Sequence, residues 1–490
     1  MCSPDRKYLA GVLLLLIAWL TSCNPAPKDE MPITTNSPEA RKLFIKGLKL
    51  YENLREDEAR EFFSQALEKD MDFALCHFYL ADVATSAIEY QTHLKMAVTL
   101  APKVSAGEQL LIKSLRALAE NNPKKAIELR KELVAMYPND KRAHRFLGYL
   151  YRGRNDLAAI TEYQKAIELD RKYAPAYNNL GYAYRRLGQY DKAVQAFKQY
   201  IALLPDEPNP YDSIADLYTK MGKYEEGIKY YKKAVKLNKA FVFSQRKIGE
   251  NYLFLGKFNK ARRAFEKALQ LAETPAEKIN TMLIYATSYI YENQPAESIA
   301  ATIRAMQLAK TANLPEWQAE ILLFRTKLYL ENKDFENVSK SLEKCKIILQ
   351  AAQLSPATAE NYQKHVIYYE ACAKARQRDF GSALALAESL KVRIAQGNDP
   401  SGMEEYHRLV GFINHQQGHH ATAVAHFRQA EPNDPYSMYM WAECEAALDN
   451  PAGARKLFAK VANWNENSIE YALVRQKAIS QIAREGFSQN

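Results

Sequence analysis

The sequence predicts an all-α fold in which about twelve pairs of antiparallel helices stack into an α-α superhelix. Two observations lead to this prediction. The chain is rich in alanine, leucine, lysine, glutamate and tyrosine and has 18 glycines in 490 residues, proportions that suit helices. In addition, three consecutive segments superimpose at a spacing of about 34 residues, which indicates repeated structural units.

The three copies share a large–small–large pattern of side chains. In the first predicted helix the matching sets are Leu180, Ile214 and Ile248, then Gly181, Ala215 and Gly249, then Tyr184, Tyr218 and Tyr252. In the second they are Ala193, Gly227 and Ala261, then Phe197, Tyr231 and Phe265, then Tyr200, Ala234 and Ala268. A small residue on one helix lets its partner approach closely, and large residues fill the space on either side. Gly188, Gly222 and Gly256 stand where the first helix must end.

This pattern resembles the tetratricopeptide repeat, a helix pair with a 34-residue period. The resemblance is clear over 174–272 and extends with decreasing fidelity to 39 and to 466. Because the spacing lengthens near 273–278, we predict an N-terminal array over 39–275 and a degenerate C-terminal array over 276–490. Within the latter, 467–486 is predicted to form a helix that covers the exposed end of the array.

The N-terminus carries an export signal. Residues 1–22 combine two basic residues with an apolar stretch too short to span a bilayer comfortably. The stretch ends in Leu20-Thr21-Ser22-Cys23, which resembles the lipobox of bacterial lipoproteins, in which the cysteine is acylated and becomes the first residue. The resemblance implies a membrane anchor through lipid, such as palmitate, on Cys23. An ordinary signal peptide and an uncleaved anchor remain alternatives.

Residues 23–38 follow as a proline-rich, polar segment that we expect to be a lipidated tether. Asn24 replaces the aspartate that retains some lipoproteins at the inner membrane, so the outer membrane is favoured. Lys28-Asp29-Glu30 resembles a surface-export tag, which leaves the periplasmic side and the cell surface both open.

Several function classes find no support. The formal net charge of +10 is spread along the chain without a basic run, so nucleic acid is not an expected partner. Motifs of phosphate loops, dinucleotide sites, zinc proteases and serine hydrolases are absent from the sequence. Cys76, Cys345, Cys372 and Cys444 are far apart in apolar stretches and fit buried thiols. We therefore predict neither catalysis nor a cofactor.

Five of the nine histidines fall within 407–426. They are His407, His415, His419, His420 and His426. Imidazoles at such spacing can converge on a transition metal. However, no cysteine or acidic residue shares the tight part of this window, and histidine is common in polar turns. We therefore predict no metal site here, while leaving the question open.

The concave groove is the expected binding surface. The resemblance implies that ligands meet the inward face of each first helix, which carries over to ten positions of this sequence. They are Arg145, Tyr149, Arg152, Asn178, Tyr182, Arg185, Asp212, Asp216, Arg246 and Glu250. Arginine and tyrosine suit peptide carboxylates and amides. Tyr149 and Tyr182 replace the asparagines of the chaperone-binding carboxylate clamp, which argues against that specificity.

The sequence thus favours a lipid-anchored scaffold or adaptor of the bacterial cell envelope that binds a protein or peptide. A glycan- or nutrient-capturing outer-membrane lipoprotein is the alternative, and an enzyme of unrecognised chemistry is a third class. The identity of the partner, the membrane face and the oligomeric state are left open, including self-association through an end or a groove.

Overall fold

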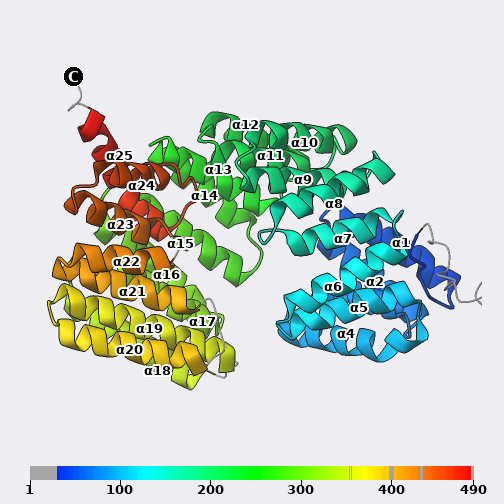
Figure 1. Cartoon of the computed structure of the whole chain (residues 1–490), viewed down its shortest axis with the longest axis horizontal. Helices are drawn as coiled ribbons and strands as arrows, with labels where there is room; N and C mark the ends of the chain where they lie inside the picture. The colour runs from blue at the N-terminus through cyan, green and yellow to red at the C-terminus, as the bar shows by residue number, and fades with distance from the viewer. Residues whose placement is uncertain (1–29, 353, 355, 397–401, 431–433, 487–490) are drawn as a thin grey trace, which may run out of the picture. The chain divides into compact units, whose positions relative to one another are not determined.

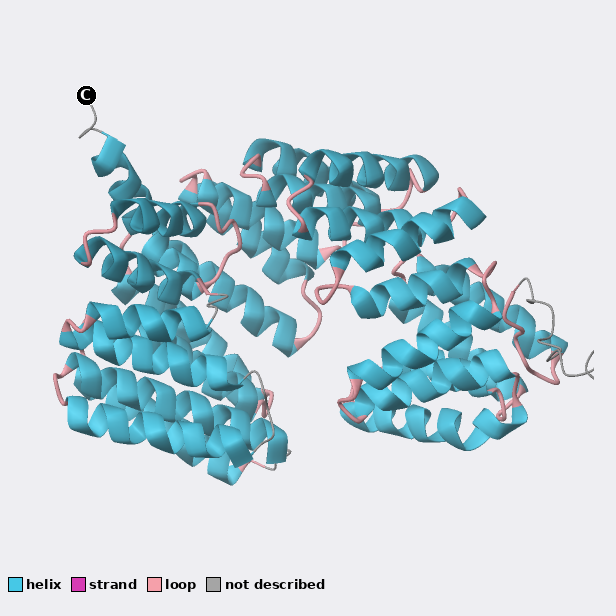
Figure 2. Cartoon of the chain, viewed as in Figure 1, coloured by secondary structure: helices cyan, strands magenta, loops and turns pink. Residues whose placement is uncertain are grey.

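The computed structural model describes residues 30–352, 354, 356–396, 402–430 and 434–486. The predicted signal peptide 1–22, together with Cys23, Asn24 and Lys28-Asp29, lies outside these ranges. The described residues form 25 α-helices and one short 3₁₀-helix, without a strand (Figure 2). They fall into two units, Met1–Leu203 (unit 1) and Leu204–Asn490 (unit 2).

Unit 1 contains ten α-helices, which Figure 1 colours from blue to green. They are α1 (Pro38–Glu52), α2 (Glu56–Lys69), α3 (Ala74–Asp82), α4 (Ala87–Leu100), α5 (Ala106–Ala119), α6 (Pro123–Met136), α7 (Lys141–Tyr151), α8 (Asp156–Leu169), α9 (Ala174–Arg186) and α10 (Tyr190–Leu203). The 3₁₀-helix Ala101–Lys103 follows α4.

Unit 2 contains the other fifteen α-helices. They are α11 (Asn209–Lys220), α12 (Tyr224–Leu237), α13 (Val242–Phe254), α14 (Phe258–Leu271), α15 (Pro275–Tyr291), α16 (Pro295–Thr311), α17 (Pro315–Glu331), α18 (Phe335–Ala351), α19 (Pro356–Arg376), α20 (Phe380–Gln396), α21 (Gly402–Gln417), α22 (His420–Ala430), α23 (Pro435–Ala447), α24 (Pro451–Ala462) and α25 (Ile469–Gly486).

Helices α1 to α24 form twelve consecutive pairs, as predicted, and each first helix packs most extensively on the second helix of its own pair. First helices of neighbouring pairs also contact one another, as α3 does with α5 and α19 with α21. Second helices of neighbouring pairs make no comparably extensive contact among the described residues. The first helices therefore form the inner, concave layer of each unit, and the fold is the predicted α-α superhelix.

The glycine–aromatic contact predicted from the repeat is present in the pairs. A Cβ atom built on Gly181 of α9 would lie 2.6 Å from the ring of Phe197 on α10. The same distance is 2.7 Å between Gly47 and Phe63 and 2.6 Å between Gly148 and Tyr163. In these three pairs the first helix requires glycine because a buried ring occupies the space of a side chain.

The turn that ends the first helix needs a left-handed residue. Gly188, Gly222 and Gly256 fill this position with φ of +70°, +74° and +67°, as predicted. In other pairs the position is filled by non-glycine residues, for example Lys333 with φ of 58° and Arg378 with φ of 65°. The same turn therefore recurs where the sequence lacks its usual glycine.

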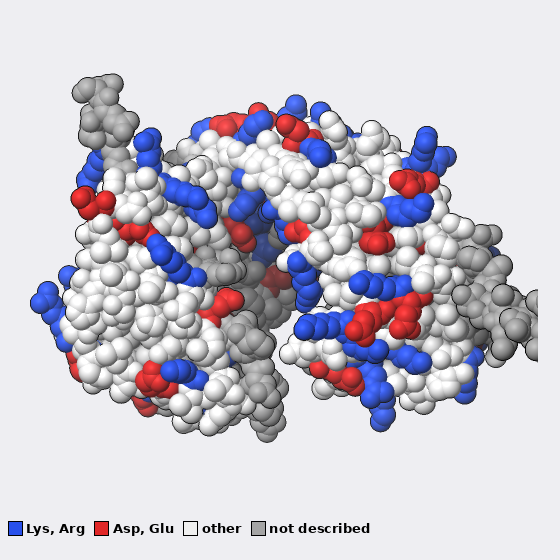
Figure 3. Space-filling view, in the orientation of Figure 1, with Lys and Arg blue, Asp and Glu red and all other residues white. Residues whose placement is uncertain are grey.

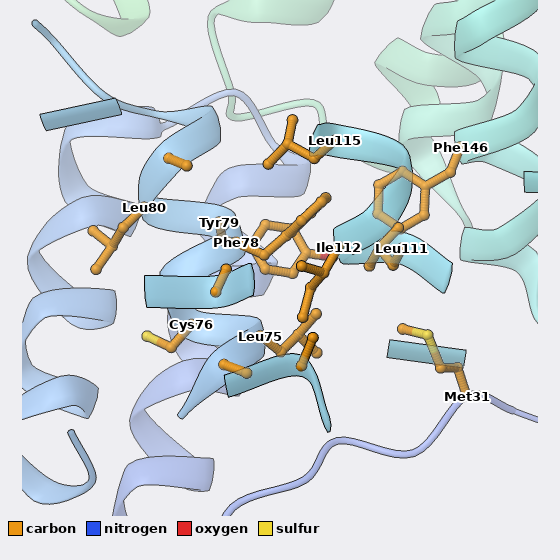
Figure 4. Packing of buried hydrophobic residues seen from close by; sticks show 14 of the residues in the cluster. Met31, Leu75, Cys76, Phe78, Tyr79, Leu80, Leu111, Ile112, Leu115 and Phe146 are labelled. Carbon is orange, nitrogen blue, oxygen red and sulfur yellow. The ribbon is translucent and has the colours of Figure 1, made fainter. Parts of the chain in front are cut away.

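The core of unit 1 holds the N-terminal segment in place. Phe78 and Tyr79 of α3, Ile112 of α5 and Phe146 of α7 are buried together (Figure 4). Residues 30–37 of the predicted tether are held by hydrogen bonds to helices and turns of this unit. Met31 N donates to Asp140 Oδ2 (2.9 Å), Thr34 N to Glu108 Oε1 (2.8 Å) and Asn36 N to Asp70 Oδ2 (3.2 Å). This part of the segment is fixed to unit 1 rather than flexible.

The two compact units divide between Leu203 and Leu204, and the predicted boundary between the two repeat arrays at 275/276 lies within unit 2 and stays a prediction. In the structure α14 and α15 pack on one another within unit 2. The longer period downstream has another cause, because α15 to α18 have 17 residues each, against 14 in α14.

The last helix does more than cover the end of the array. Helix α25 packs along α23 and α24, as a capping helix would, and it also contacts α15. Tyr471 is fully buried against Phe254 and Tyr291, and Arg475 Nη2 donates to the carbonyl of Phe254 (3.2 Å). The chain thus returns across the inner layer of unit 2, and its own C-terminal segment occupies part of that concave face.

Candidate functional site

Arg145 lies on the inner helix α7 of unit 1. The side chain of Asp140 caps this helix by accepting hydrogen bonds from the backbone N–H of Arg142 (2.7 Å) and Ala143 (3.3 Å). The Arg145 guanidinium carbon lies 5.0 Å from the ring centre of Phe146 and 5.9 Å from that of Tyr51. Its Nε and Nη2 are buried and have no hydrogen-bond acceptor in the described part of the chain.

A second arginine close by is in a similar state. Arg130 of α6 is 4 % exposed and packs over the rings of Phe78 and Phe146. Its Nε donates to Ser114 Oγ (2.5 Å), while its Nη1 has no acceptor among the described residues. Burial lowers the pKa of Arg130 to about 10, so it stays cationic at neutral pH.

The acidic and phenolic groups around these arginines are partly engaged with each other. Glu52 accepts a hydrogen bond from Tyr173 OH (2.9 Å), and Tyr51 OH donates to Asp82. Burial, followed by the charge of Asp82, raises the pKa of Tyr51 well above its usual value, so it remains a neutral donor. The region therefore offers two buried cations with N–H groups that lack acceptors.

The other predicted residues of unit 1 form aromatic–arginine pairs. Arg152 stacks over Tyr149 at 4.2 Å, and Tyr149 is 48 % exposed. Arg185 lies 5.7 Å from the ring centre of Tyr182, which in turn packs edge-on against the buried Phe197. Asn178 is buried on the same helix α9. The structure thus gives Tyr149 and Arg152 open surface, while Asn178 lies within the helix packing.

The remaining four predicted residues lie in unit 2. Asp212 is buried and accepts a hydrogen bond from Ser244, which joins α11 to α13, and burial raises the pKa of Asp212 to about 7. Glu250 is buried in an ion pair with Lys247 (2.7 Å). Arg246 lies over Phe243, and Asp216 is close enough to Asp212 to contribute to its raised pKa. Asp212 thus links two inner helices, Glu250 is paired within α13, and the ten residues are divided between two units.

Unit 2 has a cavity of about 310 Å³ that the sequence analysis missed. It is bounded by the inner faces of α17, α19, α21 and α23 and by the start of α25. Lys327 Nζ pairs with Glu470 Oε1 at its wall (2.5 Å). Arg376 Nη2 contacts both Glu331 Oε1 (2.5 Å) and Tyr436 OH (2.6 Å). No motif marked these residues, because the repeat is degenerate here and α25 comes from far along the chain.

The cavity combines paired charges with aromatic walls. Tyr368, Tyr369 and Phe412 line it, and burial together with nearby Lys327 lowers the pKa of His365 to about 4, so this imidazole is neutral. The ion pairs Lys327–Glu470 and Arg376–Glu331 place polar groups beside these rings, so the cavity suits a small polar ligand or a side chain of a partner.

The histidine cluster separates into two contacts. His407 and His426 meet through their Nδ1 atoms (2.9 Å). His415 Nδ1 lies 3.3 Å from Cys444 Sγ, and its Nε2 lies 3.4 Å from a carboxylate oxygen of Glu443. The short sequence window around these histidines holds no cysteine or acidic residue, but α23 brings Cys444 and Glu443 to α21.

The distribution of charged side chains concerns binding of nucleic acid, and the length and apolar character of the helices concern the crossing of a membrane. Basic and acidic side chains are interspersed on the face drawn in Figure 3. In the described ranges, no helix combines the length and apolar character needed to cross a lipid bilayer.

Comparison with protein families identifies tetratricopeptide repeats in three places. Their family models match residues 113–174, 162–195 and 207–274. No curated protein sequence matches the chain.

Three solved structures are among those similar to this chain. The structure of MamA is 25 % identical, covers 34 % of this chain and 95 % of its own, and has a TM-score of 0.30. A tetratricopeptide repeat protein from Parabacteroides merdae is 16 % identical over 53 % of this chain and 98 % of its own, with a TM-score of 0.38. YrrB, described as having an unusual peptide-binding site, is 17 % identical over 37 % of this chain and 93 % of its own, with a TM-score of 0.29.

Three observations indicate the same repeat: the helix pairs, their glycine–aromatic packing and the matching family models. The chain is an all-α superhelical protein that carries tetratricopeptide repeats.

Proposed function

We propose that this protein is a lipid-anchored scaffold or adaptor of the bacterial cell envelope, whose unit 1 binds a protein or peptide partner at Arg145. The observation that carries the proposal is the pair of buried guanidinium N–H groups on Arg145 without an acceptor in the described chain. Burial of unsatisfied donors is costly, and a bound acceptor would offset that cost.

The surrounding chemistry favours a carboxylate as that acceptor. Arginine presents a planar fork that matches a carboxylate, and charge-assisted hydrogen bonds are the stronger ones. Arg130 adds a second cation, whose Nη1 has no acceptor among the residues that the structure describes. Exposed Tyr149, stacked with Arg152, provides rigid apolar area of the kind found at binding hot spots. The expected ligand is therefore an acidic segment or the C-terminus of a partner protein.

Anchoring through Cys23 rests on its lipobox-like sequence. Because Met31 is hydrogen-bonded to Asp140, only residues 24–31 separate the lipidated cysteine from the helical part of unit 1. Eight residues span at most about 28 Å when fully extended. Unit 1 would consequently work close to the membrane surface and would reach partners that lie on or in that membrane.

The binding proposal is tested by cross-linking capture from native envelopes, followed by affinity measurements with a peptide from the captured protein. Arg145→Ala should weaken binding of the free-carboxylate peptide by about 10- to 100-fold, the size expected for a charge-assisted hydrogen bond of roughly 1.5–3 kcal/mol. Arg145→Lys keeps the charge but loses the fork, and it should restore only part of the affinity.

The matched control changes the exposed basic residues Lys165 and Lys198, which lie on second helices of the same unit. Their replacement by alanine should leave binding unchanged, and circular dichroism should show that every variant is folded. A partner that binds Arg145→Ala as tightly as wild type would refute the assignment of the site.

Anchoring is tested separately by Cys23→Ser. This variant should lose acyl label and leave the membrane fraction, while the peptide affinity of unit 1 stays the same. Protease treatment of intact cells then distinguishes the cell surface, where the protein is digested, from the periplasmic side, where it is protected.

A glycan- or nutrient-capturing lipoprotein is the second candidate, and the cavity of unit 2 is the observation that favours it. Its tyrosine and phenylalanine walls and paired charges suit a small polar ligand. A ligand that raises the melting temperature of wild type but not of Tyr369→Ala would support this function. If neither sugars nor amino acids shift the melting temperature, capture by this cavity is excluded for those classes.

A further inference from the structure

Three side chains with metal-binding atoms meet between α21, α22 and α23 of unit 2. His415 lies in the last turn of α21, His420 begins α22, and Cys444 lies on α23. One ligand atom from each residue lies within 4.8 Å of the others. Gly418, with φ of +82°, makes the tight turn that brings the two histidines to the same side.

The distances suit a single tetrahedral ion after a small contraction. His415 Nδ1 and Cys444 Sγ are 3.3 Å apart. Zinc bonds of about 2.0–2.1 Å to nitrogen and about 2.3 Å to sulfur place two such ligands roughly 3.6 Å apart. The pair is therefore already near ligand spacing, and one ligand atom of His420 lies no more than 4.8 Å from a ligand atom of each of the other two residues.

The surroundings of both histidines point to a ligand. The Nδ1 of His420 is buried and has no hydrogen-bond partner in the described part of the chain, which is costly unless something binds it. The other nitrogen of His415, Nε2, lies 3.4 Å from Glu443 Oε2. A carboxylate on the second ring nitrogen is the usual support of a metal-bound histidine, because it fixes the ring orientation.

An ion would also have a route to the site. Cys444 is fully buried, but the His415 side chain is 16 % exposed and that of Glu443 is 37 % exposed. His419, which neighbours His420 in sequence, is exposed and is not part of the group.

We propose that His415, His420 and Cys444 form a site for one zinc ion, with the fourth position left to water. Imidazole and thiolate are ligands that zinc favours over magnesium or calcium. Binding would join three successive helices and so stabilise this part of unit 2. The proposal is independent of the peptide-binding function assigned to unit 1.

The test uses the full-length lipidated chain in detergent, stripped with a chelator and titrated with cobalt(II) and then with zinc(II). One cobalt per chain should bind with a thiolate-to-metal charge-transfer band and the strong visible bands of tetrahedral cobalt, and zinc should displace it. His420→Ala should weaken cobalt binding at least tenfold, and Cys444→Ser should abolish the charge-transfer band.

His419→Ala is the matched control, since it removes an adjacent imidazole outside the group and should leave the titration unchanged. His420→Ala also keeps the His407–His426 pair, so a loss in this variant is specific. Far-ultraviolet circular dichroism checks folding, and if Cys444→Ser does not fold, His420→Ala decides. Absence of a thiolate band at saturating cobalt, or equal affinity in wild type and His420→Ala, would overturn the proposal.

Discussion

Replacing Gly181 by alanine should loosen the pair α9/α10, although alanine is the better helix former. The new Cβ would lie 2.6, 2.7 and 2.8 Å from three ring atoms of Phe197, about 1 Å inside normal carbon–carbon contact. Phe197 is fully buried, so its ring cannot move aside without shifting its neighbours. Overpacking costs typically 1–3 kcal/mol, while alanine gains roughly 0.8–1 kcal/mol in helix propensity.

The net loss is therefore about 1 kcal/mol, or about a fivefold increase in the local opening equilibrium. Hydrogen exchange of peptides from α9 and α10 measures it directly, which avoids treating a repeat array as a two-state system. Gly381→Ala is the matched control, because a Cβ there meets nothing within 4 Å. This control should leave α20 unchanged or slow its exchange. Slower exchange in Gly181→Ala would refute the claim that the ring occupies the space of a side chain.

Three further predictions concern single contacts. Burial raises the pKa of Asp212 to about 7, above its unfolded value of about 3.9, so the free energy of unfolding should fall as pH rises from about 4 to 7. In urea unfolding, Asp212→Asn should remove this dependence on pH. The same dependence in wild type and variant would contradict the prediction. Glu108→Ala removes the hydrogen-bond acceptor of Thr34 N and Oγ1, so limited proteolysis should cut the segment 30–37 sooner than in wild type. Equal rates of cleavage in both proteins would contradict the attachment of this segment to unit 1. Tyr471→Ala removes a fully buried side chain and should cost about 3–5 kcal/mol of stability. The amides of both α25 and α15 should then exchange hydrogen faster. A change confined to α25 would mean that the two helices are not coupled.

The repeat could be found from sequence because its contacts are local and recur. Gly181 meets Phe197 within one helix pair, and the same contact returns at Gly148 and Tyr163. Each copy of the contact sets a glycine against an aromatic ring 15 or 16 residues further along the chain, so the fold class and the number of pairs could be predicted. The turns at Lys333 and Arg378 were harder to predict from sequence, because they contain no glycine at the position with positive φ. The packing of the helices on both sides of each turn imposes this backbone conformation.

The candidate sites depended more on the tertiary structure. The sequence identified Arg145 as an inward residue, yet only the structure places it over Phe146 with unpaired N–H groups. Its surroundings come from α1 and other helices, and no local pattern records them.

What the sequence by itself determined is the helix pair, its period and the positions that face its partner helix, since these depend on residues within about one repeat. Only the tertiary structure decided the contacts made once in the chain. Met31 meets Asp140 across 109 positions, and Lys327 meets Glu470 across 143. The return of α25 to α15 is of the same kind. Such contacts arise from the way successive pairs stack, and a single contact between distant segments leaves no periodic trace in one sequence.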